Sequence, residues 1–294
     1  MLSNTIIAAL AGLASSFGWG VGDFFAARAS KDTNPAIAQL VVESLSAAIF
    51  LVIFLVFMRA SFYSDAAGLA YGVGSGIFMS LSSVCFFRGL QAGPVSLVSP
   101  ISAAYPLVTT VILLTVFHDS LNLLQLGGIA LIVIGVMTAS ELVTTKVSAF
   151  KLSRGVKYAL ATALFWGVGY ALLGPAIKAL GWQTTSLVQL LTMALFFIAM
   201  FRVIYPSVKL TKADLHPRKN KFAIFNSVIS LFAIVIFNFG VTYASSAAIV
   251  TAISASYPAI TIFLALKQFK EEVRFIPLIG GFVSVIGVII LAIA

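Results

Sequence analysis

Apolar runs of membrane-spanning length recur along the whole chain, and this pattern restricts the fold more than any other feature. Short gaps that hold most of the charged residues separate the runs. An α-helix needs about 20 apolar residues to cross the hydrocarbon core of a bilayer. We therefore expect an all-α membrane protein with ten transmembrane helices, near residues 4–24, 35–57, 66–87, 94–117, 122–143, 155–177, 183–204, 221–243, 246–267 and 275–294.

The charged residues argue against a water-soluble fold. Only 9% of the residues are charged and 61% are hydrophobic, whereas soluble proteins carry about 25% charged residues. The net charge of +9 would suit a nucleic-acid partner only if it formed one basic face, but the Lys and Arg residues lie in the gaps between apolar runs. We expect the lipid bilayer as the surrounding medium and no nucleic acid as partner.

The two halves of the chain resemble each other in sequence. The segment WGVG at 19–22 recurs at 166–169, QL at 39–40 recurs at 189–190, and ISAAYP at 101–106 recurs as ISASYP at 253–258. Two copies of this length do not make a solenoid. We interpret residues 1–143 as the first repeat, 144–154 as a linker and 155–294 as the second repeat.

Each predicted repeat holds five spans, which is an odd number. The second repeat must therefore enter the membrane from the opposite side, and the two form an inverted-topology pair. Such pairs place a substrate site near the midplane between the repeats, where rocking of one repeat against the other exposes it to each side in turn.

The basic residues predict the orientation of these spans. Loops that follow odd-numbered spans, with their immediate flanks, hold sixteen of the eighteen Lys and Arg residues, and the opposite side holds only Arg59 and Lys178. Under the positive-inside rule the odd-numbered loops are cytoplasmic. We expect a multi-pass protein of the inner or plasma membrane with both termini on the extracytoplasmic side.

Two acidic residues are candidates for coupling transport to protons. Glu43 lies eight residues into the second span, where a carboxylate is costly. It binds a proton or a substrate amine, or else it fixes helix packing in a protonated or hydrogen-bonded form. Asp23 ends the first predicted span, and there the favoured interpretation is an interfacial carboxylate paired with Arg28 or Lys31. A coupling role is the alternative.

Aromatic residues beside glycine or proline are candidates for the lining of a cavity. Trp19 and Trp166 are equivalent in the two repeats, and an interfacial belt or simple packing is the other interpretation. Tyr105 and Tyr257 each precede a mid-span proline, which removes a backbone hydrogen bond and kinks the helix. The predicted kinks are at Pro100, Pro106 and Pro258, and further substrate-binding candidates are Gln39, Gln189, Ser102 and Ser254.

Close helix packing is predicted in the third span. Gly68, Gly72 and Gly76 are spaced four residues apart, so they share one helix face. Small residues at this spacing let a neighbouring helix approach closely.

Taken together, these motifs resemble the EamA family of the drug/metabolite transporter superfamily. The resemblance rests on the ten spans in two halves, on the Trp-Gly pair of each first helix, and on residues 98–106 with their partner 252–258. The family's acidic turn between its fourth and fifth helices is matched loosely by His118-Asp119 and by Lys270-Glu271, without the usual Gly-Glu. The resemblance implies secondary transport of small metabolites, often efflux.

We expect a transporter and no enzyme. Residues 20–23 spell the Gly-x-Gly-Asp pattern that resembles intramembrane aspartyl proteases, but no second Asp lies inside any predicted span to share a proton. His118 and His216 lie in loops, so we expect neither a metal nor a cofactor. The predicted function is secondary active export or exchange of small organic metabolites such as amino acids by a monomer or homodimer, with the proton as coupling ion. A sugar or nucleoside uptake carrier and a passive channel are alternatives.

Overall fold

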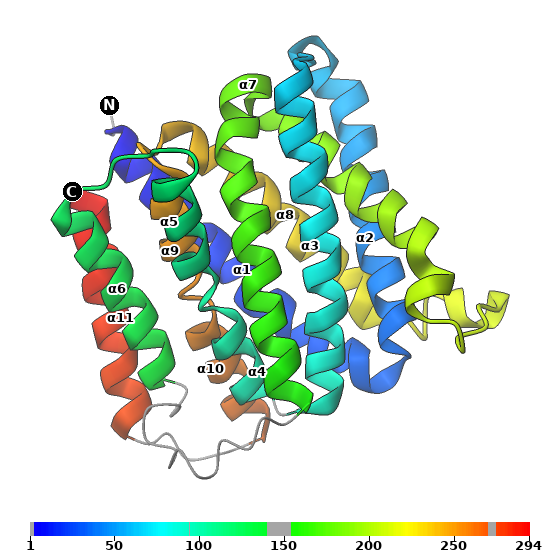
Figure 1. Ribbon diagram of the computed structural model, residues 1–294. Coiled ribbons are helices and arrows are strands. Elements are labelled where there is room, and N and C mark those ends of the chain that lie inside the picture. Colours follow the sequence, from blue (N-terminus) through cyan, green and yellow to red (C-terminus); the bar gives the residue numbers. More distant parts are fainter. Residues whose placement is uncertain (1–2, 94, 140–153, 270–274) are drawn as a thin grey trace.

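The computed structural model describes residues 3–93, 95–139, 154–269 and 275–294, and the regular elements in these segments are all helical (Figure 1). They are α1 (Asn4–Asp32), α2 (Pro35–Ile53), α3 (Ala66–Ala92), α4 (Val95–Ser102), α5 (Tyr105–Thr115), α6 (Leu123–Ala139), α7 (Arg154–Ile204), α8 (Lys221–Tyr243), α9 (Ala247–Ser254), α10 (Pro258–Phe269) and α11 (Phe275–Ile293). A π-helical turn at Phe54–Met58 extends α2, and 3-10 turns lie at Arg59–Ser61 and Lys212–Leu215. The expected linker, up to residue 153, and Lys270-Glu271 lie outside the described residues.

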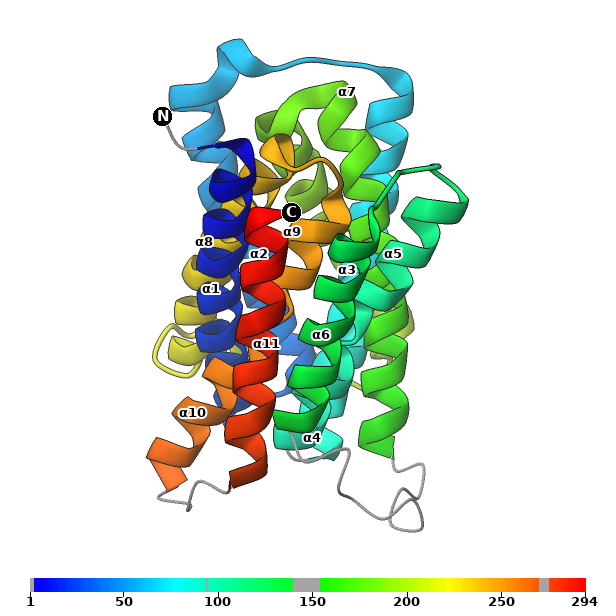
Figure 2. The ribbon, with the colours of Figure 1, turned by 90° about the vertical axis from the view of Figure 1, so that its left-hand side faces the viewer.

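The helices form an elongated bundle (Figure 2). Its outer surface carries many exposed hydrophobic side chains. Six helical segments of the described chain are long and apolar enough to cross a membrane. Large hydrophobic side chains point outward along them, among them Phe17, which is 61% exposed, and Phe57, which is 79% exposed. Exposing so much apolar area to water would be unfavourable, so the bundle is suited to a lipid environment.

Local capping signals set the starts of two long helices. Asn34 accepts a hydrogen bond from the backbone N–H of Ala36 at 2.9 Å, and Pro35 occupies the first turn of α2, where its missing N–H costs nothing. Asp65 accepts from the N–H of Gly68 at 2.7 Å at the start of α3. Both helices therefore begin where the sequence places the boundary between a gap and an apolar run.

The first helix is longer than predicted. We expected the first span to end near residue 24, but α1 continues to Asp32. Ala26 and Ala29 in this extension are buried, and they belong to the same core cluster as Phe86 and Phe87 of α3. Alanine has the strongest helix propensity, and tertiary packing holds the segment in place although its hydropathy has fallen.

Helix α7 contains two helical segments separated by a bend. Its 51 residues would extend about 75 Å if straight, more than twice the thickness of a bilayer core. Gly181 interrupts it with a φ of 72°, a backbone conformation that favours glycine. The segments 154–180 and 182–204 correspond to the sixth and seventh predicted spans.

Helices break at the predicted proline positions of the two ISAxYP segments. Helix α4 ends at Ser102 and α5 begins at Tyr105, with Pro106 in its first turn. Helix α9 likewise ends at Ser254, and α10 begins at Pro258. Proline has no N–H to donate to the preceding turn, so each apolar run becomes two short helices joined by a turn.

Close contacts between the two halves occur in pairs that exchange under the sequence repeat. A Cβ built on Gly20 would lie 2.9 Å from the carbonyl oxygen of Tyr257, and one built on Gly167 would lie 3.0 Å from that of Tyr105. The hydroxyl of Thr261 donates to the carbonyl of Gly20 at 3.2 Å, and that of Thr109 donates to the carbonyl of Gly167 at 3.0 Å. These paired contacts describe an approximate two-fold relation between the halves.

Helix α3 packs closely on α7 through the glycine face predicted in the third span. A Cβ on Gly68 would lie 2.7 Å from the Cβ of Ala179, and one on Gly76 would lie 2.8 Å from the carbonyl oxygen of Gln189. The stripe therefore serves helix packing on both segments of α7.

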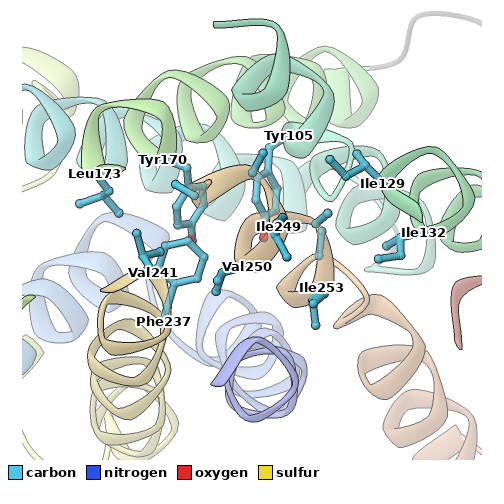
Figure 3. Packing of buried hydrophobic residues seen from close by; sticks show 14 of the residues in the cluster. Tyr105, Ile129, Ile132, Tyr170, Leu173, Phe237, Val241, Ile249, Val250 and Ile253 are labelled. Atoms are coloured by element: carbon cyan, nitrogen blue, oxygen red, sulfur yellow. The ribbon is translucent and has the colours of Figure 1, made fainter. Parts of the chain in front are cut away.

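The central core lies where α5, α7, α8 and α9 meet. Figure 3 shows Tyr105, Tyr170 and Phe237 directed toward one another, with Ile249 and Val250 of α9 beside them. Every residue of α9 is buried. This cluster fills one part of the interior, and a cavity occupies another.

Candidate functional site

A cavity of about 100 Å³ lies between α1, α2, α3, α7 and α8. A single buried water needs about 10–15 Å³, so the space is large enough for a small solute. Among the residues predicted as substrate-binding or coupling groups, the cavity is lined by Trp19, Asp23, Glu43, Tyr105, Trp166, Gln189 and Tyr257. Its lining includes the late part of α1 and α3 and the early part of α8, which places it toward the end of the bundle drawn lowest in Figure 1.

Glu43 is held on α2 by uncharged hydrogen-bond donors. Its side chain is 3% exposed. Gln39 Nε2 donates to Glu43 Oε1 at 2.8 Å, and Ser80 Oγ of α3 donates to Glu43 Oε2 at 2.9 Å. Gln39 also donates to the carbonyl oxygen of Ser80 at 3.1 Å, so the pair fixes α2 against α3. The carboxyl group is thus both positioned by packing and present at the cavity wall.

Asp23 is buried rather than interfacial, which corrects the interpretation favoured from the sequence. We expected it at the membrane surface, paired with Arg28 or Lys31, but α1 continues past it and its side chain is only 7% exposed. Ser99 Oγ of α4 donates to Asp23 Oδ2 at 2.7 Å. Arg28 lies over the ring of Phe222 instead, with its guanidinium carbon 5.3 Å from the ring centroid. The added helical turns are the reason that Asp23 faces the interior.

Trp19 and Trp166 lie at the cavity within a chain of aromatic contacts. The Trp19 ring contacts Tyr170 edge to face, with 5.8 Å between centroids. The Trp166 ring contacts Tyr105 in the same geometry at 5.7 Å. Tyr105 and Tyr170 stack at 4.8 Å and complete the chain. The two repeats therefore contribute matching tryptophans to one cavity, with their orientation set by neighbouring rings.

The tyrosines of the two helix breaks bond across the repeat boundary. The hydroxyls of Tyr105 and Ser254 lie 3.1 Å apart, and Tyr257 donates to the carbonyl oxygen of Ser99 at 3.3 Å. Ser99 therefore links Tyr257 to Asp23. These bonds join the break of one repeat to that of the other at the cavity.

Three predicted candidates, Gln39, Ser102 and Ser254, are buried but are not among the residues described as lining the cavity. Gln39 supports Glu43, and Ser254 supports Tyr105. The buried hydroxyl of Ser102 has no hydrogen-bond partner among the described residues. In contrast, Gln189 lines the cavity, and its Oε1 accepts from Asn238 Nδ2 at 3.0 Å.

Sequence reasoning missed several lining residues. Met79, Tyr170, Met193 and Asn226 all line the cavity. Three of the four are apolar or aromatic and look like ordinary core residues in a membrane helix. The repeat could have identified two of them. In the matched segments Tyr170 occupies the position of Asp23, and Met193 occupies that of Glu43.

A second hollow lies at the opposite end of the bundle, beyond the central core. It is lined by residues of the α5–α6 connection, the end of the first α7 segment and the start of α9. Asp119 lies there, with Oδ1 at 3.6 Å from Lys178 Nζ and with Oδ2 accepting from Ser246 Oγ at 2.7 Å. One carboxylate thus ties three elements together at this end.

Comparisons with known proteins agree with the repeat and the fold. The model of the EamA-like transporter family matches this chain twice, at residues 6–140 and 153–293. An uncharacterized protein of Methanocaldococcus jannaschii is 29% identical over 133 residues, which make up 45% of this chain and 96% of that protein. A solved crystal structure superposes with a TM-score of 0.71 at 14% identity, covering 96% of this chain and 95% of its own, which shows a shared fold.

Proposed function

The chain belongs to the EamA-like transporter family, a family of membrane transporters, and from this premise we propose that it carries small organic metabolites, amino acids and related solutes among them, by alternating access through the central cavity. We further propose ten transmembrane helices in two inverted repeats, 1–143 and 155–294, in the inner or plasma membrane with both termini extracytoplasmic. The carrier works as a monomer or homodimer.

The observation that carries the proposal is the cavity bounded by residues that exchange between the two halves. Trp19 and Trp166 occur on it as a pair, as do Tyr105 and Tyr257. The glycine contacts beside them also exchange. In an inverted repeat, rocking one half against the other converts each contact into its partner, so the same cavity can face either side.

The two ends of the bundle differ in the way this mechanism needs. The cavity lies toward the end that carries Arg28 and Arg88, which the basic-residue pattern predicts to be cytoplasmic. Toward the other end the interior is filled by the core of Tyr105, Phe237 and α9, beyond which Asp119 ties α7 to α9. This arrangement supports a cytoplasm-facing conformation with a closed extracytoplasmic side.

Proton coupling through Glu43 fits the same geometry. The donors described for the buried Glu43 carboxyl group are uncharged, and a buried carboxyl group without a cation is costly to ionise. It therefore holds a proton until a solute replaces that proton. Exchange of proton for solute at one site makes the carrier an exporter or exchanger. Asp23 on the same cavity is the second coupling group.

Solute counterflow in proteoliposomes tests the carrier. Saturable exchange of labelled solute against an internal excess supports alternating access, while conductance without counterflow supports a passive channel and overturns it. The coupling step is tested by Glu43→Gln, which keeps the side-chain shape but cannot be protonated in this pH range. We expect the pH dependence of exchange to vanish in this variant and to persist in Asp214→Asn, whose carboxylate lies on the exposed 205–220 loop.

A further inference from the structure

The two repeats place different chemistry at equivalent positions on the cavity. The segment WGVG is followed by Asp23 in the first repeat and by Tyr170 in the second, and Glu43 in the first corresponds to Met193 in the second. All four side chains line the cavity. The carboxyl groups of the site therefore come from the first repeat, and a phenol and a thioether replace them in the second.

A third pair differs in the opposite sense. A Cβ on Gly22 would lie 3.0 Å from Asn226 Oδ1, and a Cβ on the equivalent Gly169 would lie 3.1 Å from the Cε methyl group of Met79. The exchange of contacts thus makes Asn226 and Met79 equivalent. Because α8 packs on α1, we group the amide of Asn226 with the two carboxyl groups. We call Asp23, Glu43 and Asn226 the acidic set. We call Met79, Tyr170 and Met193 the apolar set.

In the part of the cavity lining that the structure describes, the acidic set faces no positively charged side chain. Among the described residues that line the cavity, none is Lys, Arg or His. Asp23 accepts a hydrogen bond from Ser99, and Glu43 accepts hydrogen bonds from Gln39 and Ser80, all of which are uncharged. A solute with a carboxylate or phosphate would meet carboxyl groups and no cation, whereas a cation would complete an ion pair out of water.

The remaining lining suits the body of such a cation. Trp19, Trp166 and Tyr105 line the cavity with aromatic rings, the residue type whose faces attract ammonium groups. The apolar set offers two thioethers and a ring, and methionine adapts to bodies of irregular shape.

We propose that the transported solute is a small organic monocation, an amine with an apolar body and no acidic group, whose ammonium lies against Asp23 and Glu43 and whose body packs on Met79, Tyr170 and Met193. This proposal rests on the proposed transport function and narrows its small organic metabolites to amines without an acidic group, which excludes zwitterions such as amino acids. One cation entering displaces one proton from the carboxyl pair, so the charge of the site stays constant.

A matched series of three compounds tests the charge requirement on the purified full-length chain. Phenethylammonium, phenylalanine and phenylpropionate share one ring but carry a cation, a zwitterion and an anion. We expect phenethylammonium to raise the apparent unfolding temperature in a saturable manner, and the other two to need at least about tenfold higher concentrations. Equal or tighter binding of phenylalanine overturns the proposal.

Carboxyl variants test the site. Glu43→Gln and Asp23→Asn should each weaken phenethylammonium binding by about tenfold or more, since each removes a charge-assisted contact. The matched control Asp214→Asn should bind as the parent chain does. Unchanged affinity in both cavity variants overturns the assignment of the ammonium to the acidic set, and circular dichroism of each variant confirms that it is folded.

Counterflow distinguishes a wrong substrate class from a wrong transport function. Phenethylammonium exchange in proteoliposomes, with a weaker apparent affinity and no pH dependence in Glu43→Gln, supports both the carrier and its substrate class. Counterflow of phenylalanine but not of phenethylammonium overturns the cation proposal and leaves the carrier intact. Binding of phenethylammonium without counterflow of any compound in the series overturns transport while the cation site stands.

Discussion

The interface between α6 and α11 gives a sharp test of the two-fold packing, because one helix offers both a crowded and an open glycine. A Cβ on Gly135 would lie 2.5 Å from the backbone nitrogen of Ser284 and 2.7 Å from the carbonyl oxygen of Gly280. Both atoms belong to the backbone of α11, so no rotamer change can relieve the overlap. A Cβ on Gly127, eight residues earlier in α6, would meet nothing within 4 Å.

We expect Gly135→Ala to destabilise the protein and Gly127→Ala not to. Overpacking of a closely packed core costs about 1–3 kcal/mol, and a clash with backbone favours the upper part of that range. By the two-fold relation Gly287→Ala should cost a similar amount, since its Cβ would lie 2.7 Å from the carbonyl oxygen of Gly128. The measurement is the free energy of unfolding in mixed micelles with increasing denaturing detergent.

Two outcomes would contradict this expectation. If Gly135→Ala and Gly127→Ala unfold at the same detergent fraction, α6 and α11 do not pack as closely as described. If Gly135→Ala is destabilised but Gly287→Ala is neutral, the interface is close but the two-fold relation fails there.

Three further predictions concern single polar groups. Tyr105→Phe removes the hydroxyl that pairs with Ser254 and should lower the free energy of unfolding by about 0.5–1.5 kcal/mol; full retention of stability would show that the bond is not formed. Asp119→Asn weakens the tie at the far end of the bundle, so we expect faster solute counterflow with little change in affinity, and slower counterflow would contradict a closing role. The hydrogen bond from Thr211 lowers the pKa of Asp214. The ionised carboxylate therefore stabilises the turn above the ordinary Asp pKa, and this stabilisation is lost as the pH falls through the lowered pKa. Proteolysis of the loop should increase over this acidic range, and Thr211→Val should move the onset of cleavage to higher pH.

The positions of the helices follow from the sequence where a local signal marks an end. Helices α2, α3 and α8 begin at Pro35, Ala66 and Lys221, where the apolar runs were expected to start. The end of α1 could not be predicted in this way, because alanines with modest hydropathy stay helical only when a partner such as α3 covers them. The bend at Gly181 is a matter of backbone conformation, and its position agrees with the gap between two apolar runs.

The cavity was predictable only in its polar and repeated members. Glu43 stands out in the sequence because a mid-span carboxyl group is rare, and Trp19 because its motif occurs twice. Asp23 was placed wrongly, since its surroundings depend on how far α1 continues. In the sequence, Met193 looks like any lipid-facing methionine. Only its equivalence to Glu43 in the repeat distinguishes it.

The pairing of α6 with α11 also affects the order of assembly during synthesis. The glycine face of α6 is complete once residue 139 has been made, but its partner α11 begins only at Phe275. At about 5–20 residues per second, this face waits on the order of ten seconds before α11 emerges. Until then the first repeat carries an uncovered contact surface within the membrane, so a truncated chain that lacks α11 should be a substrate for quality-control proteases.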